Sequence, residues 1–151
     1  MNHYFVHDTP IGELILEANS DYLIKISFNR KHLNQVGSFS AKKNLILEKT
    51  VKQLDEYFFN NRKIFTINYF LETTCFFKKV IEEVSLIKFG KVKSYKQIAR
   101  ILKNKNAYRA VGNAIARNPL PIIIPCHRVI KSSGELGGYR GGIINKKYLL
   151  S

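Results

Sequence analysis

The sequence predicts a mixed α+β protein, with a small N-terminal sheet carrying one packed helix and a mostly helical C-terminal domain after it. Two observations predict this fold class. Most short strand-like apolar segments lie before residue 72, whereas helical patterns with capping signals dominate after it. The polar stretch Glu72-Thr-Thr74 separates the two patterns. We therefore expect two domains, residues 1–72 with a structural role and residues 73–151 with the chemistry.

The N-terminal half contains the strand signals. We expect strands at residues 3–7, 13–18, 23–28 and 65–70. The polar segment 29–44 is expected to be a loop. Residues 45–59 form the one helical pattern, because their apolar side chains recur at helical spacing: Leu47, Val51, Leu54 and Phe58.

The C-terminal half reads as helices joined by short turns. Thr74 is a candidate N-cap for a helix over 75–86, and Ser94 with Gln97 forms a capping-box pattern that opens a helix to Leu102. After the polar turn 103–106, a further helix is expected over 107–117, ended by Asn118-Pro119. Helix, turn, helix is the outline of a helix-turn-helix, here winged-helix-like, although many helix pairs are only packing units.

Basic charge is concentrated in the second half. Residues 1–74 hold 9 Lys and Arg against 8 Asp and Glu, a net charge of +1, whereas residues 75–151 hold 16 against 3, a net charge of +13. Such asymmetry is expected of a nucleic-acid-binding module beside a neutral companion. A basic surface for acidic lipids or RNA is the alternative, which charge alone leaves open.

Cys126 stands in an unusual setting, after the apolar run Ile122-Ile123-Ile124 and Pro125 and before His127 and Arg128. A thiol attacks only as thiolate, and neighbouring cations favour that form. We therefore expect Cys126 at a fixed depth at the edge of the core, with cationic partners. A buried structural cysteine is the plainer alternative.

The segment Ile124-Pro-Cys-His-Arg-Val-Ile130 resembles the active-site signature of the O6-alkylguanine-DNA alkyltransferases. The resemblance extends, in order, over most of residues 75–151. It includes Phe89 to Ala99, which is similar to the segment before the family's DNA-binding helix, and Arg109 to Ala114 with Arg117-Asn-Pro119, which is similar to that helix and its end. Ser132-Ser-Gly134 and Gly137 to Gly142 resemble loops that close the alkyl pocket. The first half matches only loosely, through Thr9 to Gly12 and Gln53 to Phe58.

This resemblance implies a partner, double-stranded DNA containing O6-alkylguanine, bound in the minor groove with the damaged nucleotide flipped out. Flipping is also required because a thiol hardly reaches the O6-alkyl carbon inside a duplex. By resemblance, Arg109 fills the gap left in the stack. The implied DNA-binding residues are Tyr95, Arg109, Ala110, Gly112, Asn113, Arg117 and Arg128. The implied alkylguanine pocket consists of Tyr95, Asn118, Val129, Tyr139 and Arg140, with Asn118 tying the recognition helix to the active-site loop.

The implied reaction is a displacement at carbon, in which Cys126 takes the alkyl group and His127 takes the thiol proton, directly or through a water. The thioether product has no good leaving group, so the protein is consumed in one turnover. No cofactor is expected. Some family members carry a zinc ion in the N-terminal domain, but residues 1–74 here contain no cysteine, so no metal is expected either.

One position departs from the family pattern. Many members have a glutamate that orients the active-site histidine, and the sequence places Lys147 there. A non-catalytic alkyltransferase-like protein that only marks lesions is therefore one alternative, although such proteins lack the acceptor cysteine. A Cys-His hydrolase is another, although adjacent Cys and His side chains are poorly placed for a direct proton relay.

Hydropathy and cysteine content indicate the compartment in which the protein is expected. No apolar run is long enough to span a bilayer, and no leader pattern is present at the N-terminus. The two cysteines, Cys75 and Cys126, make no disulfide framework, and a free thiol suits a reducing compartment. We expect a monomer in the cytoplasm, or in the nucleus of a eukaryote.

Overall fold

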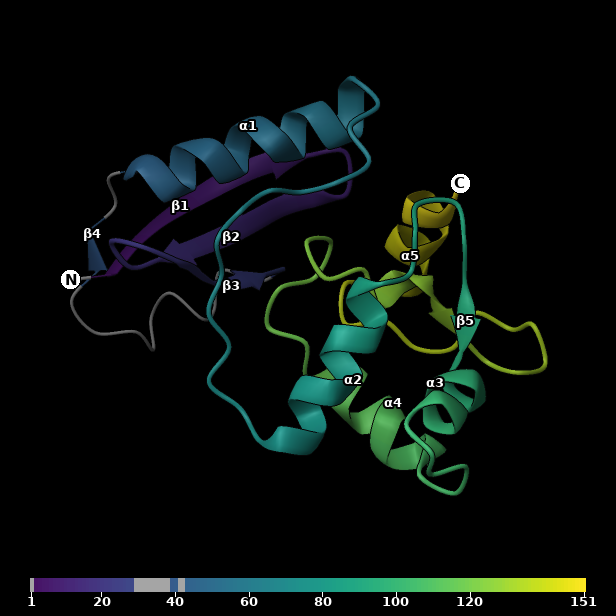
Figure 1. The fold of residues 1–151 in the computed structure, drawn as a ribbon. Coiled ribbons are helices and arrows are strands. Elements are labelled where there is room, and N and C mark those ends of the chain that lie inside the picture. Colours follow the sequence, from purple (N-terminus) through teal and green to yellow (C-terminus); the bar gives the residue numbers. More distant parts are fainter. Residues whose placement is uncertain (1, 29–38, 41–42) are drawn as a thin grey trace. The chain divides into compact units, whose positions relative to one another are not determined.

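The computed structural model describes residues 2–28, 39–40 and 43–151. The chain divides into two compact units, Met1–Leu71 and Glu72–Ser151, and each is described by itself (Figure 1).

The N-terminal unit is a four-stranded sheet with one helix. The strands are β1 (Asn2–Thr9), β2 (Gly12–Ala18), β3 (Leu23–Ser27) and β4 (Phe39–Ser40), in the order β3-β2-β1-β4. β1 pairs antiparallel with β2 and parallel with β4, and β2 pairs antiparallel with β3. Helix α1 (Leu45–Phe59) lies along one face of this sheet (Figure 1). The three predicted strands nearest the N-terminus and the predicted helix are therefore confirmed.

Helix α1 is fixed by its cap and by its buried face. The Asn44 side chain accepts a hydrogen bond from the Leu47 N–H at 2.9 Å, which satisfies a free donor of the first turn. Leu47 and Leu54 of the predicted stripe are fully buried. The buried Gln53 amide holds the following segment, because its Oε1 accepts from the Thr66 N–H at 2.9 Å and its Nε2 donates to Thr66 Oγ1 at 2.8 Å.

Two predictions for this unit are corrected. The segment 65–70 is not a strand, since it forms only an isolated parallel bridge between Tyr69 and Leu23. The reason is that the Gln53 side chain takes the Thr66 N–H, which a ladder would need. The predicted loop 29–44 lies mostly outside the described residues, but it contains β4, which pairs with β1.

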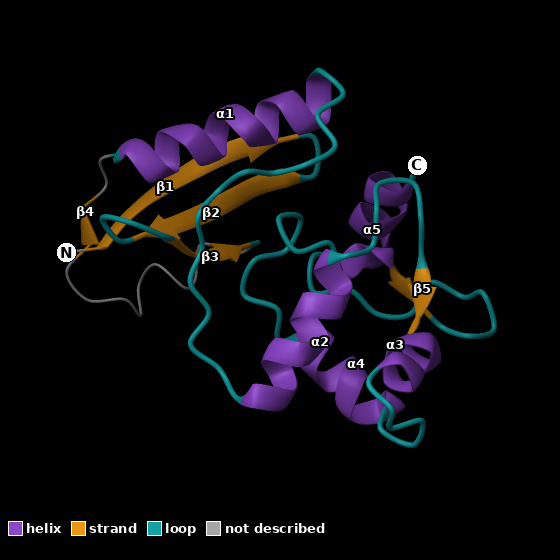
Figure 2. Ribbon diagram, viewed as in Figure 1, coloured by secondary structure: helices purple, strands orange, loops and turns teal. Residues whose placement is uncertain are grey.

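The C-terminal unit is mostly helical (Figure 2). Its elements are α2 (Cys75–Ser85), β5 (Lys93–Ser94), α3 (Tyr95–Ile101), α4 (Tyr108–Ala116), a 3₁₀ turn (Cys126–Arg128), β6 (Val129–Ile130) and α5 (Ile143–Leu150). β5 and β6 pair in parallel. The core is apolar and draws on several helices, with Val80, Ile81, Val84, Ile98 and Val111 all at or near zero exposure.

The predicted caps of this unit are present. Thr74 accepts from the Phe77 N–H at 3.3 Å at the start of α2. Ser94 accepts from the Gln97 N–H at 3.0 Å, and the Gln97 side chain accepts from the Ser94 N–H at 2.8 Å, which completes the capping box of α3.

The turn between α3 and α4 begins with a residue in an unfavourable conformation. Lys103 has φ 59°, in the left-handed region that glycine and asparagine prefer. Its N–H donates to Arg100 O, and the Asn104 N–H donates to Ala99 O, which is the Schellman arrangement of a helix end. This turn reverses the chain, so that α3 and α4 pack together as the helix-turn-helix pattern predicted.

Candidate active site and nucleic-acid interface

The loop that connects α4 to Cys126 is held by the hydrogen bonds of one side chain. Asn118, 3% exposed, donates from Nδ2 to Ile124 O at 2.9 Å and accepts at Oδ1 from the Leu120 N–H at 3.0 Å. Within this loop Ile122 has φ 76°, a strained conformation for a β-branched residue. Such strain persists only where surrounding contacts overdetermine the backbone, and the two Asn118 hydrogen bonds supply that constraint. Asn118 thus forms the hydrogen bonds that the family resemblance implied for it.

Cys126 follows a tight corner at Pro125. Pro125 has φ −79° and ψ 64°, and the Cys126 N–H donates to Ile124 O at 2.7 Å, which together form an inverse γ-turn. Cys126 is 7% exposed and opens the 3₁₀ turn. The thiol therefore lies at the edge of the core, at the fixed depth that the apolar run and the proline predicted.

The surroundings of the thiol act on its ionisation in opposite directions. Burial raises the pKa of Cys126, and this effect prevails. A hydrogen bond from the Asn118 side chain and the positive charges of Lys146 and Arg140 pull the pKa of Cys126 down again. The thiol has cationic neighbours, Lys146 and Arg140, but they are not the adjacent His127 and Arg128 that the sequence suggested, since His127 is neutral and Arg128 hydrogen-bonds to Ile87 O.

His127 is fully buried. Burial, followed by the charges of Arg128 and Lys146, lowers the pKa of His127 to about 3, so its imidazole is neutral at pH 7. Within the part of the chain that the structure describes, neither ring nitrogen has a hydrogen-bond partner. The neutral imidazole has a lone pair for a proton, but its low pKa makes it a weak base, and it makes no direct hydrogen bond to Cys126.

Arg128 occupies a different place from the one expected for a DNA-binding residue. Its side chain is 7% exposed, donates from Nη1 to Ile87 O at 2.7 Å and lies over the ring of Phe89. These contacts hold the guanidinium against the segment after α2, with buried Ile87 on one side and the partly exposed Phe89 ring on the other. Arg128 therefore fastens the 3₁₀ turn to the segment after α2, and its side chain is buried in these contacts rather than exposed as expected of a DNA-binding residue.

The sequence also assigned the wrong lysine to the neighbourhood of His127. Lys147 is exposed, whereas Lys146 is fully buried and contributes to the pKa shifts of both Cys126 and His127. Sequence reasoning missed Lys146 altogether. The available signal was its helical spacing, three residues before Leu149, which places a lysine on the buried stripe of α5.

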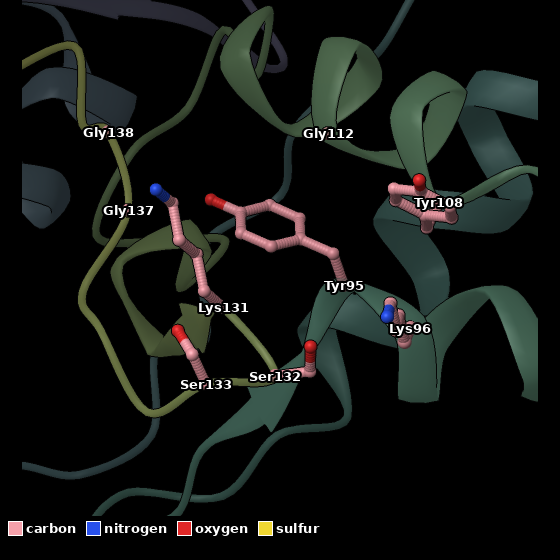
Figure 3. Close-up of a pocket in the computed structure, with 9 residues that line it drawn as sticks. All are labelled: Tyr95, Lys96, Tyr108, Gly112, Lys131, Ser132, Ser133, Gly137 and Gly138. Atoms are coloured by element: carbon pink, nitrogen blue, oxygen red, sulfur yellow. The ribbon is translucent and has the colours of Figure 1, made fainter.

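A pocket of about 420 Å³ lies between α3, α4 and the loop after β6 (Figure 3). Tyr95 points into it from the start of α3, between Gly112 on one side and Gly137 on the other (Figure 3). Burial, and secondarily the charge of Cys126, raises the pKa of Tyr95, which places this ring in the electrostatic neighbourhood of the thiol. The whole lining consists of Tyr95, Lys96, Tyr108, Gly112, Lys131, Ser132, Ser133, Gly137 and Gly138.

Four other expected pocket residues lie outside this lining. Asn118 and Val129 are buried, Tyr139 is half-buried and Arg140 is exposed. The carbonyl of Val129, which was expected to offer a polar contact to the base, accepts a hydrogen bond from Lys146. Of the five expected pocket residues, Tyr95 lines this pocket.

Helix α4 presents a basic and small-residue stripe. Arg109, Ala110, Asn113 and the C-cap residue Arg117 are exposed, whereas Val111, Ala114 and Ile115 are buried. Gly112 is half-buried and faces Tyr95, since an added Cβ there would lie 3.8 Å from the Tyr95 ring. The exposed stripe brings together four of the predicted DNA-binding residues on one face.

Among the described residues, no three His, Cys, Asp or Glu side chains are grouped so that they could hold a metal ion. In the same residues, every helix is too short or too polar to cross a bilayer.

Comparison with known proteins covers both units. The ribonuclease-like domain of 6-O-methylguanine DNA methyltransferase matches residues 2–69, and the DNA binding domain of 6-O-methylguanine DNA methyltransferase matches residues 75–151. A methylated-DNA–protein-cysteine methyltransferase of Methanosarcina barkeri is 37% identical and covers 98% of this chain and 94% of its own length. The constitutive methylated-DNA–protein-cysteine methyltransferase of Bacillus subtilis is 36% identical and covers 93% of this chain and 88% of its own.

Solved structures agree. The OGT of Mycobacterium tuberculosis, crystallised in complex with DNA, is similar with a TM-score of 0.87 at 36% identity, over 98% of this chain and 90% of that one. The O6-methylguanine-DNA methyltransferase of Pyrococcus kodakaraensis is similar with a TM-score of 0.70 at 27% identity, over 99% of this chain and 97% of that one. The chain, with its Pro-Cys-His-Arg corner and its helix-turn-helix, therefore belongs to the 6-O-methylguanine DNA methyltransferase family.

Proposed function

We propose that this DNA-repair methyltransferase moves the alkyl group of O6-alkylguanine in double-stranded DNA to Sγ of Cys126, irreversibly and in one turnover. The observation that carries the proposal is the buried thiol of Cys126. The loop before it is held by a hydrogen bond from Asn118 to Ile124 O, and the charges of Lys146 and Arg140 act on the thiol. A nucleophile at a fixed position loses little freedom on attack, which lowers the barrier of an in-line displacement.

The chemistry follows from the two neighbouring side chains. Sγ of Cys126 forms a bond to the alkyl carbon while the bond from that carbon to guanine O6 breaks, and guanine leaves as its anion or takes up a proton. We propose His127 as the base for the thiol proton: its imidazole is neutral at pH 7, although its pKa of about 3 makes it a weak base. Since His127 makes no direct hydrogen bond to Cys126, we propose a bridging water. No metal or organic cofactor takes part.

DNA is bound by the C-terminal domain, residues 73–151, and the N-terminal domain, residues 1–72, has a structural role. The net charge of +13 in residues 75–151 supports this division, as does the exposed stripe of α4. We propose that this stripe enters the minor groove, that Arg109 fills the stack after the damaged nucleotide flips out, and that Tyr95 contacts the flipped base. The protein acts as a monomer in the compartment that holds the DNA, the cytoplasm or a eukaryotic nucleus.

The two alternatives have less support. A lesion-marking protein lacks the acceptor thiol, whereas Cys126 is present here and is buried directly after the turn at Pro125. A Cys-His hydrolase needs the imidazole hydrogen-bonded to the thiol and oriented by a third group, and neither ring nitrogen of His127 has a partner among the described residues.

Peptide mapping by mass spectrometry tests the proposal. After incubation with duplex DNA containing O6-methylguanine, the peptide of Cys126 gains one methyl group, and Cys126→Ala abolishes transfer. Cys75→Ser is the matched control, because Cys75 is exposed at the start of α2, and it leaves transfer unchanged. A methyl group on Cys75, or unchanged repair by Cys126→Ala, would falsify the proposal.

A further inference from the structure

Lys146 is the most unusual buried side chain of the C-terminal unit. It is fully buried in α5, whereas its neighbour Lys147 is exposed. Burying an ammonium group is costly unless its three donors are satisfied. A lysine in this position therefore calls for a reason beyond packing, since an apolar residue of similar length would fill the space without that cost.

The ammonium group joins two parts of the active site. Its Nζ donates to Val129 O at 2.7 Å, to Leu136 O and to Gly138 O at 3.3 Å. Val129 begins β6, directly after the 3₁₀ turn that starts at Cys126. Leu136 and Gly138 flank Gly137 in the loop that walls the pocket. Lys146 therefore fastens the wall of the pocket to the strand that follows the nucleophile.

The position of that wall is a tight fit against Tyr95. Gly137 has φ 74°, and an added Cβ there would lie 3.3 Å from Tyr95 Oη. A small shift of the loop would therefore change the gap that Tyr95 and Gly137 enclose. Because Lys146 binds the carbonyls on both sides of Gly137, it sets that gap.

The charge of Lys146 has one anionic counterpart. Its hydrogen-bond partners among the described residues are carbonyls, and none is a carboxylate. Burial lowers the pKa of Lys146, and the negative charge of Cys126 opposes this shift by favouring the protonated form; Lys146 in turn lowers the pKa of Cys126. The charge of Arg140 in the loop also lowers the pKa of Cys126, the charge of Cys126 in turn raises the pKa of Tyr95 in α3, and His127 follows the thiol in the chain.

We propose that Lys146 is the positioning residue of alkyl transfer, which locks the Leu136–Gly138 wall of the pocket to β6 and supplies a buried positive charge that favours the Cys126 thiolate. This inference rests on the proposed role of Cys126 as the acceptor. Many family members have a glutamate that orients the active-site histidine, and here a buried cation contributes to activating the thiol instead.

The test compares the neutral variant Lys146→Met with Lys147→Met, which removes the same charge one residue later at an exposed position. The rate at which iodoacetamide modifies Cys126 is measured against pH without DNA, and peptide mapping separates Cys126 from Cys75. In Lys146→Met the midpoint of this profile moves up by about one pH unit, so the thiolate fraction at pH 7 falls about tenfold. Lys147→Met keeps the profile of the unchanged protein.

Two further variants separate charge from structure. Lys146→Gln is neutral but retains two N–H donors for the carbonyls, and it shows the same shift if Lys146→Met does not fold. Lys146→Arg keeps the charge and therefore the midpoint, but it slows benzyl transfer from free O6-benzylguanine because its planar head does not match the three carbonyls. A folded Lys146→Gln or Lys146→Met with an unshifted profile would overturn the inference. Since iodoacetamide reports on the thiol without DNA, this failure differs from failure of the proposed repair activity, which peptide mapping detects.

Discussion

The two units bury polar side chains in different ways. In the N-terminal unit, the buried amide of Gln53 is neutral and holds a neighbouring segment through Thr66. In the C-terminal unit, buried Lys146, Arg128 and His127 are cationic or titratable, and the charge of Lys146 acts on one thiol. Neutral buried groups stabilise a fold at little electrostatic cost, whereas buried charges are costly. The N-terminal unit also buries one carboxylate, Glu17, but among the described residues buried Lys and His side chains beside a thiol occur only in the C-terminal unit.

The largest expected effect is on the rate of repair, and it distinguishes an exposed DNA-contacting residue of that unit from the buried residues around the thiol. Arg109→Ala removes an exposed cation at the start of α4 and slows repair in duplex DNA about tenfold or more, since a lost contact of this kind costs roughly 1–3 kcal/mol. Transfer from free O6-benzylguanine stays unchanged, because a free base needs no flipping. Arg100→Ala removes the same charge from the exposed side of α3 and serves as the matched control with a smaller effect. Equal loss on both substrates would show that Arg109 is structural.

The second effect concerns pH. The pKa of His127 is about 3 in the folded protein and 6.5 when unfolded, so between these values the unfolded chain binds more protons and stability rises with pH. Lowering the pH from 7 to 5 therefore reduces the free energy of unfolding by about 2 kcal/mol through His127. The side chain of the His127→Gln variant cannot take up a proton, so the free energy of unfolding of this variant does not decrease in this way between pH 7 and pH 5. Urea unfolding followed by circular dichroism at both pH values measures the difference, and equal pH dependence in the two proteins would refute it.

The third effect tests whether the neutral buried group of the N-terminal unit is purely structural. Gln53→Met removes both hydrogen bonds to Thr66 and destabilises the fold by about 1–2 kcal/mol. The rate of benzyl transfer from the free base is unchanged at temperatures where the protein remains folded. Lys52→Met, exposed on the same helix, is the control for stability. A slowed transfer in folded Gln53→Met would remove the distinction between the units.

The smallest effect compares two helix ends. After α1 the left-handed position belongs to Asn61 at φ 61°, which tolerates it, whereas after α3 it belongs to Lys103 at φ 59°. Lys103→Gly therefore stabilises the protein by about 0.5–1 kcal/mol, even after the extra freedom that glycine gives the unfolded chain. Lys105→Gly, whose φ is not in that region, has no such gain. Thermal melting checks both variants, and equal melting temperatures would count against a strained turn.

Sequence by itself determined the features that depend on near neighbours. The caps at Thr74 and Ser94 are formed by residues three positions apart, and the corner before Cys126 follows from an apolar run and a proline. Such signals need only a few residues of local backbone, so they can be read without knowledge of the fold. The same applies to the charge asymmetry, which needs only counting.

Tertiary structure decided which side of an element faces the core. Adjacent residues of a helix point about 100° apart, so a one-residue error in register exchanges a buried side chain for an exposed one. This is why Lys146 and not Lys147 lies by the thiol, and why Arg128 turns inward to Ile87. The segment 65–70 failed as a strand for a similar reason, because Gln53, distant in sequence, took the N–H of Thr66. Spacing within a helix can place a residue such as Lys146 on a buried face, but the partners that it meets there are brought together only by folding.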